Sequence, residues 1–199
     1  MIINYFGHSY FLIQGKDYSI ALDPFKNVGL KEVKVKSDYV FSSHSHFDHD
    51  NLELVKGAKR VENGKNFQII STFHDQNGGA LRGKNDILIF ILDGYKIAFL
   101  GDLGEYDNQE IINKLTGVDL LLIPVGGKYT IDHIGAYEYA IKSKAKAVIP
   151  MHYKAGKSKI DIKGVVPFLE KFNDYIRVSS PFNYNGESGV INVKFEGEE

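Results

Sequence analysis

The sequence predicts a mixed α/β fold, and three features of its hydrophobic pattern support this prediction. Short apolar runs near the N-terminus are separated by glycine and by Asp-Pro, which is typical of a strand meander. Residues 87–92 form a continuous apolar run, which indicates a strand that is buried on both faces. Residues 108–115 and 134–144 instead repeat apolar side chains at helical spacing. The 199 residues are enough for one domain with a substantial core, so we expect a single domain over residues 1–199.

The first half of the chain is expected to consist of strands. Each candidate is an apolar run that is bounded by glycine, proline or polar turn residues. The expected strands are residues 2–6, 10–14, 19–22, 38–42, 67–73, 87–92 and 95–100. Asp93-Gly94 separates the last two of these and predicts a two-residue hairpin turn between them.

Helices are expected only in the second half of the chain. The helix at residues 108–115 is followed by Gly117, a candidate for its C-terminal cap. The helix at residues 134–144 follows Asp132, which is suited to cap its N-terminus. A shorter helix is expected at residues 165–172. Strands complete this half at residues 120–125, 147–150, 175–179 and 190–195.

The most informative motif lies at residues 44–49, which read His-Ser-His-Phe-Asp-His and directly follow a strand-like run. Side chains alternate along an extended chain, so His44 and His46 point the same way and can share one metal ion. Asp48 and His49 follow where the chain must turn, so they can face a second ion. Imidazole and carboxylate suit zinc, iron or manganese. The alternative is a polar surface loop, although a metal-free loop has no reason to crowd imidazoles together.

This segment resembles the first metal-binding motif of the metallo-β-lactamase superfamily of metal-dependent hydrolases. Further residues match in the expected order, each at the end of an apolar run: His74, Asp102 and His152. The opening Gly7-His8-Ser9 and the short chain are similar to a compact branch of these hydrolases. That branch includes ascorbate-6-phosphate lactonase and phospholipase-D-like enzymes acting on N-acyl phosphatidylethanolamines. The resemblance covers nearly the whole chain and implies a four-layer αββα sandwich of metallo-β-lactamase type, with the metals at one edge.

The resemblance also implies a dinuclear metal site. The first ion would be bound by His44, His46 and His74, and the second by Asp48, His49 and His152. Asp102 would bridge the two ions, and Asp48 and Asp102 would be the catalytic carboxylates. A water or hydroxide between the ions would be the nucleophile, because metal coordination lowers the pKa of water from about 15.7 to about 7. Zinc is the favoured metal, with manganese and iron as alternatives.

Each distant ligand candidate has a structural alternative. His74 can be a strand-end histidine that bonds to Asp75, and Asp102 can cap the loop after its strand. His152 can be a histidine packed in the core. All three nevertheless follow apolar runs, where sheets place functional groups.

Other residues are candidates for contact with a substrate. His8 lies in the opening turn and can contact substrate or orient a ligand, or serve only the turn. Arg82 and Lys84 lie in the glycine-rich segment 77–85 and can hold a phosphate or carboxylate, since guanidinium offers two parallel donors. Lys128, in a second glycine-containing loop, can stabilise an oxyanion or a leaving group. For both loops the alternative is a tight, exposed turn with solvated charges.

Composition narrows the classes of partner. The chain has 24 basic and 25 acidic residues without a basic block, so nucleic-acid binding is not favoured. It lacks cysteine, which excludes disulfides and thiolate ligands. No apolar run approaches the roughly 20 residues that span a bilayer. The N-terminus lacks the pattern of a signal peptide, so we expect cytoplasmic residence. The sequence does not indicate an oligomeric state.

We therefore expect a metal-dependent hydrolase that cleaves an ester, lactone, amide or phosphodiester bond of a small molecule. His46 stands where flavodiiron-type oxidoreductases of this fold place glutamate, which favours hydrolysis over oxygen or nitric oxide reduction. The alternative is a non-catalytic domain that keeps metal for stability or binds a ligand as a sensor. An open coordination position separates these hypotheses, because structural zinc is closed by four protein ligands.

Overall fold

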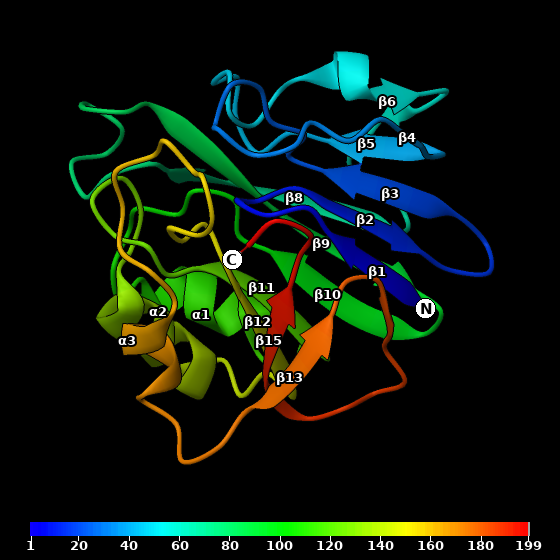
Figure 1. The fold of residues 1–199 in the computed structure, drawn as a ribbon. Coiled ribbons are helices and arrows are strands. Elements are labelled where there is room, and N and C mark those ends of the chain that lie inside the picture. The colour runs from blue at the N-terminus through cyan, green and yellow to red at the C-terminus, as the bar shows by residue number, and fades with distance from the viewer. Residues whose placement is uncertain (199) are drawn as a thin grey trace.

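The computed structural model describes residues 1–198, which form two large sheets and a small two-stranded one (Figure 1). The first large sheet is built mainly from the N-terminal meander. Its strands in spatial order are β14 (Phe182–Asn183), β1 (Ile2–Tyr5), β2 (Phe11–Gln14), β3 (Ser19–Leu22), β5 (Tyr39–Phe41) and β7 (Lys59–Arg60). β1, β2 and β3 pair antiparallel, whereas β5 and β7 join in parallel.

The second sheet contains the most deeply buried strands. In spatial order these are β13 (Ile176–Ser179), β15 (Gly189–Lys194), β12 (Ala147–Met151), β11 (Leu120–Pro124), β10 (Tyr95–Phe99), β9 (Lys84–Leu92) and β8 (Phe67–Phe73). Every residue of β11 and β12 is buried, as their continuous apolar sequences predict. The predicted hairpin joins β9 and β10. Asp93 and Gly94 both have a positive φ there, as a type I′ turn requires.

The main core lies between the two sheets, and side-chain alternation divides each strand between faces. Ile20 and Leu22 of β3 belong to this core, whereas Ala21 belongs to a second cluster on the opposite face. That outer cluster is closed by η1 (Leu52–Leu54) and by the small sheet of β4 (Val35–Lys36) and β6 (Val55–Lys56). A short 3₁₀ turn, the small sheet and loops therefore form the outer layer on this side.

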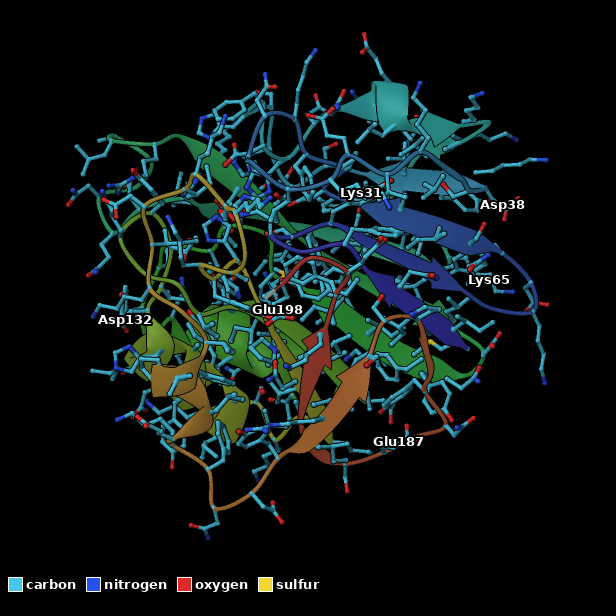
Figure 2. The ribbon with its side chains drawn as sticks, viewed as in Figure 1. Lys31, Asp38, Lys65, Asp132, Glu187 and Glu198 are labelled. Carbon is cyan, nitrogen blue, oxygen red and sulfur yellow. The ribbon has the colours of Figure 1, made fainter. Side chains whose placement is uncertain are left out.

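The α-helices cover the outer face of the second sheet (Figure 1). They are α1 (Gln109–Leu115), α2 (His133–Lys142) and α3 (Val166–Leu169). The Asp132 side chain accepts hydrogen bonds from the N–H groups of Ile134 and Gly135, so the predicted N-cap is confirmed. Asn108 caps α1 in the same way. Figure 2 shows Asp132 beside the start of α2. The α/β sandwich expected from the sequence is thus confirmed.

Strand direction places several loop starts at one edge of the sandwich. β9 pairs antiparallel with both β8 and β10, and β10, β11 and β12 are mutually parallel. The carboxyl ends of β8, β10 and β12 therefore lie at the same edge. The loop after β5 in the other sheet reaches this edge too, because Asp86 N–H donates to Ser43 O at 2.8 Å. In residues 1–198, no helix is long and apolar enough to span a membrane.

Candidate metal centre

The histidines gather at the strand ends described above. His74 follows β8, Asp102 follows β10 and His152 follows β12, while the loop after β5 supplies the predicted cluster at residues 44–49. Three overlapping groups of candidate ligand atoms result, and within each group the atoms lie within 4.8 Å of one another; His44, His49 and Asp102 form the group that joins the other two. The first group consists of His44, His46 and His74. The second group consists of His8, Asp48, His49 and His152. All of the predicted ligands are thus brought together, and His8 joins them.

Asp102 lies between the two groups. Its Oδ2 atom is 3.2 Å from the Nε2 atoms of His49, His74 and His152. Tetrahedral coordination with metal–ligand bonds of about 2.0–2.1 Å separates neighbouring ligand atoms by about 3.3 Å. The spacing of these atoms therefore fits a shared cation, and the position of Asp102 fits a bridge.

Buried atoms without partners support the same interpretation. Among residues 1–198, the Nε2 atoms of His44 and His49 and the Oδ1 atom of Asp102 are buried and make no hydrogen bond. A buried polar atom without a partner is costly, and such exceptions in native proteins call for an explanation. Lone pairs that converge on one point are satisfied when a cation occupies that point. The donor set of imidazole and carboxylate therefore fits a divalent ion.

Asp23 orients one histidine of each group, and the sequence analysis missed this role. Its Oδ2 atom lies 2.6 Å from His49 Nδ1, which must donate because a carboxylate only accepts. The same oxygen accepts from Ser43 Oγ at 2.6 Å, so Ser43 Oγ in turn accepts from His44 Nδ1 at 2.9 Å. Both Nε2 lone pairs are thereby turned toward the site. The sequence signal for this role is the position of Asp23, a carboxylate that directly follows the apolar strand at residues 19–22.

His74 is held by a backbone carbonyl rather than by its sequence neighbour. Its Nδ1 atom lies 2.9 Å from Tyr129 O, so Nδ1 donates and Nε2 keeps its lone pair for the site. Asp75 does not bond to His74 but accepts from backbone N–H groups of the loop that follows, including those of Asn77 and Arg82. The alternative that paired His74 with Asp75 is therefore wrong.

Glycines allow the loops to approach one another at this edge. Gly101 has φ +53°, and a Cβ atom there would lie 2.4 Å from the Cβ atom of Ser43. At Gly104 an added Cβ would lie 2.3 Å from Asp75 N. The side chain of Asn85 accepts from Asp102 N–H at 2.8 Å and fixes the loop between the two glycines. Any larger side chain would push the Asp102 carboxylate away from the histidines.

The electrostatics keep both carboxylates ionised. Burial opposes ionisation of Asp102, but His152 and His49 outweigh it and hold its pKa well below the usual range. Burial likewise opposes ionisation of Asp48, while the nearby rings of His8 and His49 lower its pKa. Burial also lowers the pKa of His44, to about 2, which leaves its ring neutral as a ligand must be.

His49 behaves differently in the absence of metal. Burial favours its neutral form, but Asp102 and Asp23 on either side raise its pKa well above the ordinary value. The site therefore favours positive charge, whether a proton on His49 or a metal ion supplies it. A metal ion must displace this proton in order to bind.

A cavity of about 670 Å³ opens above the two groups. His46, Asp48, His74, Asp102 and His152 all contribute to its wall. This volume is within the range of about 300–1,000 Å³ that is usual for small-molecule sites.

The predicted substrate residues differ in whether they lie at the cavity. Arg82 lines the cavity, and His8 lies behind it in the second group. Lys84 is the exposed first residue of β9 and lies outside the cavity wall. The strand thus begins within residues 77–85, which the sequence predicts to be a loop. Lys128 is ion-paired with Asp161, which itself lines the cavity.

Comparison with known proteins agrees with this arrangement. Residues 2–152 match the family described as β-lactamase superfamily domain. The chain belongs to the β-lactamase superfamily. The matched residues run from β1 to His152, so they include every strand end that supplies a ligand candidate.

Superfamily relatives cover most of the chain. A UPF0173 metal-dependent hydrolase of Staphylothermus marinus is 30% identical, over 76% of this chain and 83% of the relative. One of Pelotomaculum thermopropionicum is 28% identical, over 77% of this chain and 84% of the relative. A solved Thermotoga maritima structure, assigned to the Zn-dependent hydrolases of the metallo-β-lactamase superfamily, is 32% identical with a TM-score of 0.81. The match covers 98% of this chain and 99% of the Thermotoga maritima chain. The predicted class, a metal-dependent hydrolase of the metallo-β-lactamase superfamily, is confirmed.

Proposed function

We propose that this superfamily member is a dinuclear hydrolase that cleaves an ester, lactone, amide or phosphodiester bond of a small molecule. The observation that supports this most strongly is the pairing of two ligand groups through Asp102 beneath one open cavity. A closed structural site would have no need of a cavity at its ligands. Residence in the cytoplasm and a single-domain organisation stay predictions.

The proposed ligands are those of the sequence analysis. His44, His46 and His74 would hold one divalent ion, Asp48, His49 and His152 the other, and Asp102 both. Zinc is the favoured metal because neutral imidazoles dominate the first group, and manganese and iron are alternatives. When bound, such ions acidify water to a pKa of about 7 and polarise the oxygen of a scissile group.

The side chains of the protein have separate tasks in this proposal. Asp48 and Asp102 stay ionised and offset the repulsion between two neighbouring cations. Asp23 fixes the rings of His44 and His49, so the ligands are in place before a substrate enters. The cavity wall then orients the substrate over the exposed side of the first group, where His46 lies.

The test combines metal content with activity. Wild type, Asp102→Ala and the control Asp107→Ala are purified without chelator, and metal per chain is measured by elemental analysis. Asp107 is exposed, pairs with Lys142 and lies outside the ligand groups and the cavity wall, so its variant removes a carboxylate that is no ligand candidate. We expect close to two ions per chain in wild type and in the control, and fewer in Asp102→Ala.

Activity is then screened on esters, lactones, amides and phosphodiesters with the metal that was found. We expect wild type and Asp107→Ala to hydrolyse one of these classes and Asp102→Ala to be at least about 1,000-fold slower, as the loss of a metal site implies. A wild-type chain that stays empty after reconstitution with zinc, manganese and iron would refute the dinuclear assignment.

A further inference from the structure

Arg82 is a cavity-lining cation that has no acidic partner among residues 1–198. It is half-buried, and its guanidinium lies over the ring of Tyr129 with 5.6 Å from Cζ to the ring centroid. In the part of the chain that the structure describes, no carboxylate lies within ion-pairing distance of it. The neighbouring Lys128 differs, because it is paired with Asp161. The guanidinium is therefore free to bind a group from outside the protein.

The loop that carries Arg82 is fixed by a buried carboxylate. Asp75 accepts hydrogen bonds from the backbone N–H groups of Asn77 at 2.7 Å, Gly79 at 3.0 Å, Leu81 at 3.0 Å and Arg82 at 2.8 Å. These bonds hold the backbone of Arg82 in place at the cavity. A side chain on a preorganised loop loses less entropy when it binds a ligand.

Tyr129 connects Arg82 with the metal groups. The ring of Tyr129 stacks on Arg82, while its carbonyl oxygen accepts from His74 Nδ1. His74, Arg82 and Tyr129 all line the same cavity. A small molecule that contacts the first ligand group is therefore within reach of the guanidinium.

The charge of the cavity favours an anion. Two divalent ions would bring four positive charges, against two negative charges from Asp48 and Asp102 and one from a hydroxide. The carboxylate of Asp161 is already paired with Lys128, whereas the cavity-lining cations Arg82 and Lys159 have no such partner among the described residues. The wall thus keeps an excess of positive charge.

We propose that Arg82, stacked on Tyr129, is a subsite for a carboxylate or phosphate of the substrate, remote from the bond that is cleaved. The planar guanidinium offers two parallel donors to either group. Phe47 and Ile160 line the same cavity and suit a short hydrocarbon segment between the two ends. This proposal rests on the proposed hydrolase function.

The test uses esters that share one scissile group and differ only at the far end, which is neutral, a carboxylate or a phosphate. Hydrolysis is measured for metal-loaded wild type, Arg82→Gln and the control Lys84→Gln. Lys84 carries the same charge two residues away but lies outside the cavity. We expect Arg82→Gln to lower kcat/KM about 10- to 100-fold for an anionic ester, as loss of a charge-assisted hydrogen bond implies, with less than about twofold change for the neutral ester.

Binding provides a readout that does not depend on hydrolysis. Ether analogues of the same compounds are titrated into the metal-loaded proteins by calorimetry, and metal content is checked for each variant. The subsite predicts that an anionic ether binds wild type and Lys84→Gln more tightly than Arg82→Gln. The ether that binds wild type more tightly shows whether the subsite prefers a carboxylate or a phosphate. Equal affinity in all three proteins overturns the subsite, whereas a wild type that binds the anionic ether without cleaving any ester refutes only ester hydrolysis.

His8 supports a second inference from independent observations. Its ring is fully buried, and among residues 1–198 neither ring nitrogen makes a hydrogen bond. Its Nε2 atom lies 3.3 Å from Asp48 Oδ2, which is the spacing of two atoms that share a cation. His8 has φ 54°, and its carbonyl accepts from His152 N–H at 2.7 Å. A strained backbone held to another ligand candidate indicates that the ring position is functional.

We infer that His8 is a fourth protein ligand of the second ion. The variant His8→Gly tests this directly, because glycine adopts the positive φ at this position without strain. We expect metal content to fall toward one ion per chain at a metal concentration that gives two in wild type. Added imidazole should restore part of the loss, and the control His133→Gln, which changes a histidine outside both groups, should keep both ions. Two ions bound by His8→Gly with wild-type affinity would overturn the assignment.

Discussion

The two ligand groups differ in how firmly the protein holds them. In the second group His8, His49 and His152 are buried, and two of these have left-handed backbone joined by a hydrogen bond. In the first group His74 is buried too, but His46 is exposed at the cavity and His44 is only partly buried. The buried group thus anchors its ion in the scaffold, whereas the open group is the side that a substrate can approach.

Asp23 reduces this difference, because it supports one histidine in each group. Through direct contact it fixes His49 of the buried group, and through Ser43 it fixes His44 of the open group. His46 receives no such support from the described residues. The comparison therefore predicts that changes to the buried group cost stability and metal, while changes to the open group cost metal and activity but little stability.

The largest difference should appear between His49→Ala and His46→Ala in the metal-free protein. Removing His49 leaves the buried carboxylate of Asp23 without its charged partner, which we expect to cost about 3–5 kcal/mol. Removing the exposed ring of His46 should change the free energy of unfolding by less than about 0.5 kcal/mol. Urea denaturation measures both values. Equal losses would contradict the contrast between the groups.

The pH dependence of the metal-free protein should show the buried state of His8. Burial, reinforced by His152, lowers the pKa of His8 from 6.5 to about 4. Between these values the unfolded chain binds a proton that the folded chain does not, so this residue costs stability as the pH falls from 6.5 to 4. The full effect of this shift is about 3 kcal/mol.

The variant His8→Gly isolates this contribution. We expect its free energy of unfolding to fall less than that of wild type between pH 6.5 and pH 4, when both are measured by urea denaturation without metal. Parallel pH profiles for the two proteins would show that His8 is not held neutral by burial.

A smaller loss is expected when the close approach of the two loops is blocked. Gly101→Ala places a Cβ atom 2.4 Å from Ser43, in addition to the strain of its positive φ. We expect a loss of about 2–4 kcal/mol from overpacking and strain together. The control Gly117→Ala has φ +73° but open space around it, so only about 1 kcal/mol should be lost. If thermal or chemical unfolding showed the same loss of stability for Gly101→Ala and Gly117→Ala, close packing at Gly101 would not explain the effect.

The smallest expected effect concerns Asp23, because the ligands themselves are unchanged. Asp23→Asn should weaken the binding of both ions about 10- to 100-fold, as is usual when the partner of a ligating histidine is altered. Asp17→Asn, at an exposed turn, should bind metal like wild type. Competition with a chelator measures the affinities. If only the affinity for the second ion fell, the proposed link from Asp23 through Ser43 to His44 would be refuted.

Much of the fold could be predicted because its signals are local. The hairpin at Asp93-Gly94 and the cap at Asp132 depend on neighbouring residues only, and both were found. The buried strands β11 and β12 were recognised from their continuous apolar sequences. The strands of the small sheet, β4 and β6, were not, since each is two residues long and is fixed by contacts distant in sequence.

The sequence by itself determined the ligand types and the segment at residues 44–49, because these ligands are adjacent in the chain. The resemblance indicates His74, Asp102 and His152, and these residues meet because β8, β10 and β12 run in the same direction and end at one edge of the sheet. Only the tertiary structure decided the contacts of Asp23, the place of His8 among the ligand candidates, and the position of Arg82 but not Lys84 at the cavity. Local sequence fixes what a side chain can bind, whereas strand order and loop packing fix what it meets.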